Sequence, residues 1–285
     1  MPLRNAIPIQ DTDFWPLSIE IPQEINSVLE QYLSLYQPWI LNSNNQINGL
    51  NYFQSAKFCH GTVQAFDHFY IRHNHRRMRF LPGEFMYHRA CIKHSLNWAY
   101  VTHDDLKEND ALIISAPFSD LGSIHPDMDA LLCECDRLGI PVLIDMAYIC
   151  ISRNVEIDLN HDCIETVTTS LSKAFYGAQY LRAGIRWEKT DRDDGIDVFN
   201  SVEMAALPSL TIALNFISNH KLDWVWQKYG KAYDATVKQL NLQPTNCILF
   251  GLGGDLYQEY NRGNMLNRVC ISPEIGESYA RMQSQ

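Results

Sequence analysis

The chain has 285 residues, which is long enough for one large domain with a smaller one beside it. Acidic residues outnumber basic ones by 33 to 23, and the resulting net charge of −10 argues against a nucleic-acid partner. With 46% apolar and 20% charged residues, the composition is that of a soluble globular protein, and no apolar run approaches the roughly 20 residues of a membrane span.

The eight cysteines are scattered without the spacing of a zinc site, and several lie in apolar runs where a reduced thiol packs as a small hydrophobe. Residues 1–13 are polar and carry prolines, unlike a signal peptide. These observations predict a reducing, cytoplasmic setting, and no metal site is expected.

Helical spacing of apolar residues begins at Ile25 and predicts a helix over residues 25–36. A short run over 56–59 then meets His60-Gly61-Thr62, and residues 63–70 follow as a predicted helix. Unpaired backbone N–H groups at the start of such a helix are a ready site for phosphate. The same turn is also compatible with an ordinary helix start.

The strongly basic cluster of the chain, residues 72–79, holds four arginines and two histidines. A surface for RNA or another anionic partner is one reading of it. A solvated helix end is the expectation, because the chain as a whole is acidic and no aromatic platform accompanies the cluster.

Strands and helices then alternate up to residue 187. The predicted elements are strands over 98–101, 111–115, 141–145 and 165–168, with a helix over 127–138 that stops at Gly139. The alternation predicts a doubly wound α/β domain whose site lies beyond the carboxyl ends of the strands.

After residue 187 the pattern changes to that of a smaller α+β domain. Its predicted elements are helices over 198–220 and 223–240 and strands near 247–250 and 269–272. We expect a large domain over 43–195 and a small one made of 1–42 and 196–285.

A lysine with unusual neighbours follows the 165–168 strand. Lys173 sits in a run of hydroxyl residues, and Arg182 lies nine positions further on. Hydroxyls and a guanidinium can hold phosphate oxygens while an amine forms an imine with an aldehyde, which suits pyridoxal 5′-phosphate. Asp145 ends the preceding strand and Tyr148 follows at the same edge; a carboxylate there can keep the pyridine ring protonated. Alone, such an aspartate could equally be a helix cap.

Taken together, the chain resembles the fold-type I pyridoxal-phosphate enzymes of the class I/II aminotransferase family. The resemblance covers about residues 56–187, with a weaker match over 267–272. Its motifs are His60-Gly61-Thr62, Pro117-Phe118-Ser119-Asp120-Leu121-Gly122, Asp145-Met146-Ala147-Tyr148, Ser170-Leu171-Ser172-Lys173 and Leu181-Arg182-Ala183-Gly184. The chain departs from the family at Ser119-Asp120-Leu121-Gly122, where Asn-Pro-x-Gly is common.

The resemblance implies a role for each site residue. Lys173 would carry the internal aldimine, Asp145 would face the pyridine nitrogen, and Tyr148 would hydrogen-bond the ring oxygen, with Ser119 replacing the family's amide there. The phosphate contacts would come from Gly61, Thr62, Ser170 and Arg182. Phe85 is expected to stack on the ring, with Tyr87 as the alternative, and Arg268 to hold the substrate α-carboxylate, with Arg186 as the next candidate.

The implied activity is that of an aminotransferase, which moves an amino group between an amino acid and a 2-oxo acid, and the implied assembly is a homodimer with each site at the subunit interface. Two alternatives remain open. One is a lyase, decarboxylase or cyclase that uses the same cofactor on a specialised amino acid. The other is a non-catalytic protein with the same fold.

Overall fold

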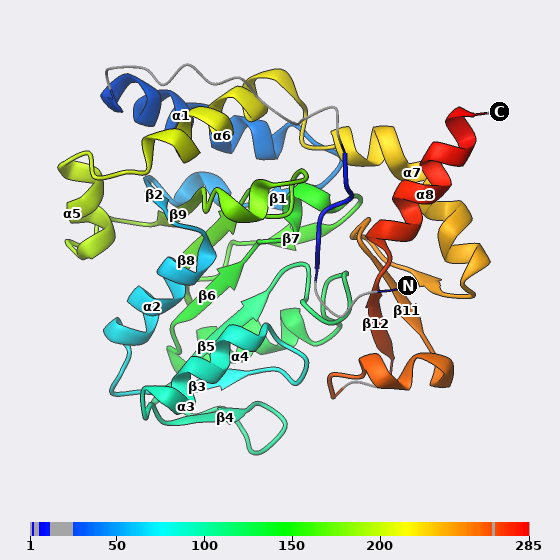
Figure 1. Ribbon diagram of the computed structural model, residues 1–285. Helices are drawn as coiled ribbons and strands as arrows, with labels where there is room; N and C mark the ends of the chain where they lie inside the picture. The colour runs from blue at the N-terminus through cyan, green and yellow to red at the C-terminus, as the bar shows by residue number, and fades with distance from the viewer. Residues whose placement is uncertain (1, 3–5, 12–24, 264–265, 285) are drawn as a thin grey trace.

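A seven-stranded sheet forms the centre of the molecule in the computed structural model, which describes residues 2, 6–11, 25–263 and 266–284 (Figure 1). Its order is β2-β9-β8-β6-β5-β3-β4, and only β9 runs antiparallel to its neighbours. The strands are β2 (Ser55–Cys59), β3 (Arg77–Phe80), β4 (Trp98–Tyr100), β5 (Asp110–Ser115), β6 (Val142–Asp145), β8 (Ile164–Ser170) and β9 (Gly184–Glu188). Residues 1, 3–5, 12 and 13 of the polar start lie outside the described residues.

The strand register brings the ends of the central strands to one edge of the sheet. Ser115 of β5 pairs with Asp145 of β6, and Asp145 pairs with Thr168 of β8. Because β9 runs the other way, its first residue, Gly184, pairs with Ser170 at the end of β8. The segments that follow β5, β6 and β8 and precede β9 therefore all begin at this edge.

Helices cover both faces of the sheet. Leu112 and Ile114 of β5 belong to the main core with α1 (Ile25–Leu41), α4 (Met128–Leu138) and α6 (Leu207–Asn219). The intervening residues, Ala111 and Ile113, belong to a second core with α2 (Thr62–Arg72) and α3 (Ala90–Lys93). Alternate residues of a strand point to opposite faces, so a continuously apolar strand must be covered on both. The predicted doubly wound α/β fold is confirmed.

The C-terminal part forms a smaller α+β layer beside the sheet (Figure 1). Its antiparallel sheet, of order β10-β11-β12, is joined by the packed pair α7 and α8. Its elements are β10 (Gln243–Pro244), β11 (Phe250–Gly253), β12 (Asn267–Cys270), α7 (Trp224–Gln239) and α8 (Ser272–Gln283). Short 3₁₀ turns connect the elements of the whole chain: η2 (Leu50–Tyr52), η3 (Met86–Arg89), η4 (Ile149–Ile151), η5 (Ala178–Tyr180) and η6 (Asp255–Tyr260).

Two local predictions differ from the structure. The helix expected over 198–220 is two helices, α5 (Gly195–Ser201) and α6, because Glu203 adopts a positive φ of 60° and Pro208 lies in the first turn of α6. In addition, β1 (Gln46–Asn48) and β7 (Glu156–Asp158) form a separate parallel pair in stretches where no strand was predicted.

The basic cluster is not a solvated helix end, so that prediction is wrong for its second half. Arg77 and Arg79 lie in β3, and Arg79 is completely buried. Both guanidiniums contact Asp110, at 2.7 Å each, and Asp104 joins them. A buried charge is tolerated when it is paired and hydrogen-bonded, and these two acids supply the partners.

Within the part of the chain that the structure describes, no helix is both long enough and apolar enough to cross a membrane. All eight cysteines are free thiols, and seven of them are buried.

Candidate active site

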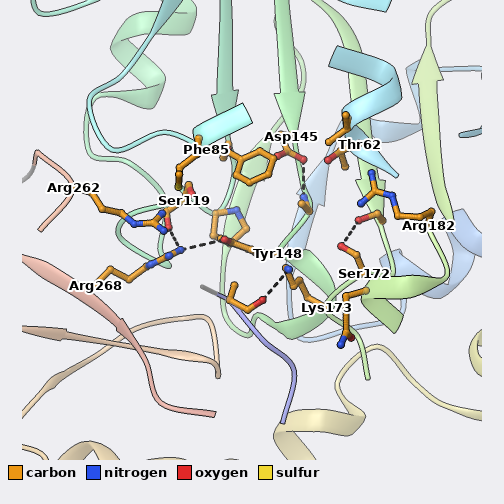
Figure 2. Close-up of a pocket in the computed structure, with 18 residues that line it drawn as sticks. Thr62, Phe85, Ser119, Asp145, Tyr148, Ser172, Lys173, Arg182, Arg262 and Arg268 are labelled. Carbon is orange, nitrogen blue, oxygen red and sulfur yellow. Dashed lines mark hydrogen bonds between the residues drawn. The ribbon is translucent and has the colours of Figure 1, made fainter. Parts of the chain in front are cut away.

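A cavity of about 230 Å³ opens at the edge where the strand ends meet, and it gathers side chains from distant parts of the sequence (Figure 2). Nine of the ten predicted site residues line it: Thr62, Phe85, Ser119, Asp145, Tyr148, Ser170, Lys173, Arg182 and Arg268. The tenth, Gly61, lies directly against Arg182. One cavity thus holds an amine, a carboxyl group, hydroxyls and guanidiniums.

Lys173 follows β8 and reaches into the cavity (Figure 2). Its Nζ donates a hydrogen bond of 2.9 Å to the carbonyl oxygen of Ala6. Burial lowers the pKa of Lys173 from its usual value, which increases the share of the neutral, nucleophilic amine. Ala6 comes from the N-terminal segment, in which no sequence pattern predicted a role at the site.

Asp145, at the end of β6, is buried beside the cavity. One oxygen of its carboxyl group accepts a hydrogen bond of 3.0 Å from the N–H of Ala147. Burial raises the pKa of Asp145 well above its ordinary value, and the nearby charge of Glu84 raises it further. An ionised Asp145 therefore gains from a cationic partner placed in the cavity.

Glu84 adjoins the cavity through Ser115, and sequence reasoning missed it. Its carboxyl group accepts hydrogen bonds from the N–H of Ser115 at 3.0 Å, from the Ser115 hydroxyl and from the N–H of Phe85 at 3.1 Å. Burial raises the pKa of Glu84 to about 7, although the hydrogen bonds from these donors act to lower it. In sequence, a glutamate after Pro82-Gly83 looks like any surface turn residue, so no pattern distinguished it.

We expect Glu84 to make the stability of the protein depend on pH. Because its pKa is raised from 4.5 to about 7, the folded state binds a proton that the unfolded state has lost over this window, and stability falls as pH rises through it. Glu84→Gln should flatten the decline in melting temperature between pH 5 and pH 8. Glu277→Gln, which changes an exposed glutamate of α8, should keep the wild-type slope. Parallel curves for wild type and Glu84→Gln would show that Glu84 does not titrate in this window.

One end of the cavity is built for an anion. Gly61 has a positive φ of 78° immediately before α2, and a Cβ there would lie 3.0 Å from Nη2 of Arg182. The guanidinium therefore rests on the backbone of the turn, where only glycine leaves room. Thr62, the first residue of α2, lines the cavity beside it. A helix N-terminus and a guanidinium at one point attract negative charge.

The opposite end of the cavity holds two arginines from the C-terminal part. Arg268 is buried, and its Nη1 donates to the carbonyl oxygen of Ser119 at 2.7 Å and to the Tyr148 hydroxyl at 3.2 Å. Its guanidinium also lies 4.3 Å from the ring centre of Phe250. Arg262 lines the same end, and its Nε lies 3.9 Å from Oδ1 of Asp120. It was not among the residues predicted for the site.

Two alternatives from the sequence lie outside the cavity. Arg186 is buried, and its guanidinium pairs with Asp194 at 2.5 Å and with Asp197 at 3.0 Å. The prediction of Arg186 as the next candidate to hold the substrate carboxylate is therefore wrong. Tyr87 turns its hydroxyl to Asp67, to which it donates at 2.9 Å. Phe85, by contrast, lines the cavity at the end of β3.

No protein-family model matches the sequence, and no curated protein matches it either. Solved structures do resemble the chain. An alanine aminotransferase from Pyrococcus furiosus is 12% identical with a TM-score of 0.63, and the alignment covers 98% of this chain and 93% of that one. A histidinol-phosphate aminotransferase from Clostridium acetobutylicum is 12% identical with a TM-score of 0.63, over 98% and 96%. A PLP-bound C-S lyase from Staphylococcus hominis is 12% identical with a TM-score of 0.62, over 93% and 88%.

The chain therefore has the fold of the fold-type I pyridoxal-phosphate enzymes, in nearly its whole length. Aminotransferases and lyases share this fold, so the likeness does not by itself choose between their reactions. That choice has to come from the residues of the cavity.

Proposed function

We propose that this protein binds pyridoxal 5′-phosphate and uses it to move an amino group between an amino acid and a 2-oxo acid. The observation that carries the proposal is that Lys173, Asp145 and Arg182 line a single cavity at the carboxyl edge of the sheet. A scaffold protein has no use for a half-buried lysine, a buried acid and an anion-binding turn in one place. This combination argues against the non-catalytic alternative.

The cavity fits the cofactor at three points. The turn at Gly61 and the guanidinium of Arg182 form a cradle for the phosphate, which a Cβ at position 61 would fill. Asp145 supplies a carboxyl group that can face the ring nitrogen. Oγ of Ser119 is buried with no hydrogen-bond partner among the described residues, and it lines the cavity where a ring oxygen could accept its proton.

When bound, pyridoxal phosphate withdraws electrons from the substrate Cα and so makes its proton acidic. The chain supplies the rest. Lys173 Nζ, whose pKa is lowered by burial, can take that proton from Cα. Arg268 can hold the substrate carboxylate with its planar guanidinium, and this contact fixes which bond at Cα faces the amine. Phe85 lines the cavity, where its ring can stack on the cofactor ring.

A panel of amino acids, added singly to the purified protein after incubation with pyridoxal phosphate, tests the proposal. An aminotransferase should release one equivalent of the matching 2-oxo acid per site without ammonia, and turnover should begin only when a second oxo acid is added. A lyase or decarboxylase would instead turn over with a single amino acid and release ammonia or carbon dioxide. A protein that shows no cofactor absorbance after incubation with pyridoxal phosphate would contradict the proposal.

We also propose a homodimer with the sites at the interface. Four exposed apolar side chains, Val198, Phe199, Val202 and Met204, form a patch in and after α5. Phe199 and Met204 of this patch border a small pocket together with His60, next to the anion-binding turn. Soluble monomers rarely leave such a patch uncovered.

Light scattering at micromolar concentration should give twice the 32.9 kDa chain mass. Val202→Asp should shift the protein towards the monomer, because it places a charge in the patch. Leu256→Glu changes an exposed apolar residue of η6, outside the patch, and should leave the dimer intact. A wild-type monomer with cofactor bound would refute the dimer.

A cytoplasmic location is proposed on the strength of the eight free cysteines, of which only Cys133 is exposed. Fractionation of cells that produce the protein would test it, and recovery from an oxidising compartment would be the contrary result.

A further inference from the structure

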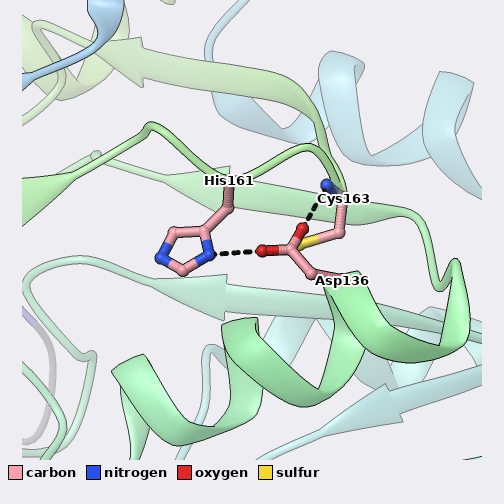
Figure 3. Close-up of side chains that lie close together, drawn as sticks. All are labelled: Asp136, His161 and Cys163. Atoms are coloured by element: carbon pink, nitrogen blue, oxygen red, sulfur yellow. Dashed lines mark hydrogen bonds and ion pairs between the residues drawn. The ribbon is translucent and has the colours of Figure 1, made fainter.

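Three side chains with metal-binding chemistry meet at a place that the active site does not use (Figure 3). Asp136 lies in the last turn of α4, and His161 and Cys163 lie in the loop that leads into β8. β8 begins at this loop and ends at Ser170, three residues before Lys173. The three metal-binding side chains therefore lie at the start of β8, and the cavity lies at its end. They belong to no site described above.

The donor atoms of these residues converge. Each residue offers one donor atom, a nitrogen, an oxygen or a sulfur, and these three atoms all lie within 4.8 Å of one another. Nδ1 of His161 is 2.6 Å from Oδ2 of Asp136, and the second carboxylate oxygen accepts the N–H of Cys163 at 2.7 Å. Cys163 Sγ lies near the same carboxylate and 3.6 Å from the carbonyl oxygen of Leu132. The backbone contact fixes the carboxylate against the loop.

We propose that Asp136, His161 and Cys163 bind a zinc ion that fastens the end of α4 to the start of β8. Imidazole nitrogen, thiolate sulfur and carboxylate oxygen are the ligand types that zinc prefers. Zinc–ligand distances of about 2.0–2.3 Å place tetrahedral donor atoms roughly 3.5 Å apart, so the cluster needs to rearrange by only about 1 Å. Asp136 is partly exposed, which leaves water to supply a fourth ligand.

Binding would exchange protons for the metal. The Cys163 thiol must lose its proton to solvent, and His161 must coordinate through Nδ1 with its remaining proton on Nε2. Zinc affinity should therefore rise with pH. A positive charge also lies beside the cluster: Lys189 Nζ donates to the carbonyl oxygens of His161 and Asp162 at 3.4 and 3.0 Å.

Titration of chelator-treated, cofactor-loaded protein with Zn²⁺ tests the proposal, with bound metal counted after equilibrium dialysis. We expect one zinc ion per chain and a higher melting temperature, because the ion binds the folded state. Co²⁺ in place of zinc should give a thiolate-to-metal charge-transfer band. Cys163→Ser should remove this band and weaken zinc binding by more than about 10-fold, since even outer partners of a metal site contribute that much.

Cys133→Ser is the matched control, because Cys133 is the exposed thiol of the same helix, three residues before Asp136. It should leave the cobalt band and the zinc stoichiometry unchanged. His161→Gln provides a second test that keeps the thiol in place, and it should also lower zinc affinity. The proposal is overturned if wild type binds less than stoichiometric zinc, or if Cys163→Ser and His161→Gln both retain the ion with unchanged affinity.

Discussion

Lys173→Ala should abolish the covalent attachment of the cofactor and reduce amino-group transfer by at least about 100-fold. Lys173 is the only lysine that lines the cavity among the described residues, so no other lysine is placed to form the link or to take the Cα proton. General-base removal alone typically costs about 10²–10⁴-fold in rate. Borohydride reduction followed by mass spectrometry should find the cofactor mass on the peptide that contains Lys173 in wild type and on no peptide of the variant.

Lys107→Ala is the matched control for this experiment, because Lys107 is an exposed lysine outside the cavity. It should keep both the reduced adduct and the activity. Thermal melting of Lys173→Ala should show a folded protein, since the lysine gives up only one hydrogen bond, to the Ala6 carbonyl. An adduct on a different lysine, or full activity in Lys173→Ala, would remove the basis of the proposed function.

The residues of the site that follow strands could be predicted from the sequence, because strand ends are easy to locate. Asp145 and Lys173 follow apolar or β-branched runs, and parallel strands bring their ends to one edge wherever they occur in the chain. Gly61 could be predicted for a related reason: a positive φ before a helix demands glycine, and the motif shows it. These features depend on local pattern and on the topology of the sheet.

The features that were missed depend instead on which side chains meet across long distances. Glu84 became part of the site only through Ser115, 31 residues away, and Ala6 only through Lys173, 167 residues away. The same reason explains the mistaken expectation for the basic cluster, because Asp104 and Asp110 turn Arg79 into a buried residue. A periodic sequence pattern indicates whether a position is polar or apolar, but it does not identify the oppositely charged residue that pairs with a charged side chain in the fold.

The proposed zinc site shows the same limit. Spacing rules find metal sites whose ligands come in close pairs, and only His161 and Cys163 form such a pair here. Asp136 is 25 residues before His161 and joins them because α4 ends beside the start of β8.

Arg268→Ala should leave the cofactor in place and weaken the binding of the amino-acid substrate. Removing one partner of a buried charged pair typically costs about 3–5 kcal/mol, which corresponds to roughly two to three and a half decades in the dissociation constant. Arg268→Lys should recover only part of this loss, because an ammonium group cannot make the paired contact that a guanidinium makes. Titration of the cofactor absorbance with substrate measures each constant.

Arg182→Ala gives the opposite pattern and serves as the comparison. Arg182 rests on Gly61 at the anion end of the cavity, whereas Arg268 lies at the end formed by the C-terminal part. Loss of Arg182 should therefore weaken cofactor retention first, as dialysis followed by absorbance would show. If Arg268→Ala releases the cofactor instead, or leaves substrate affinity unchanged, Arg268 acts through its contacts with Ser119 and Tyr148, and the carboxylate must be held elsewhere. Arg262, which lines the same end of the cavity, would then be the residue to replace.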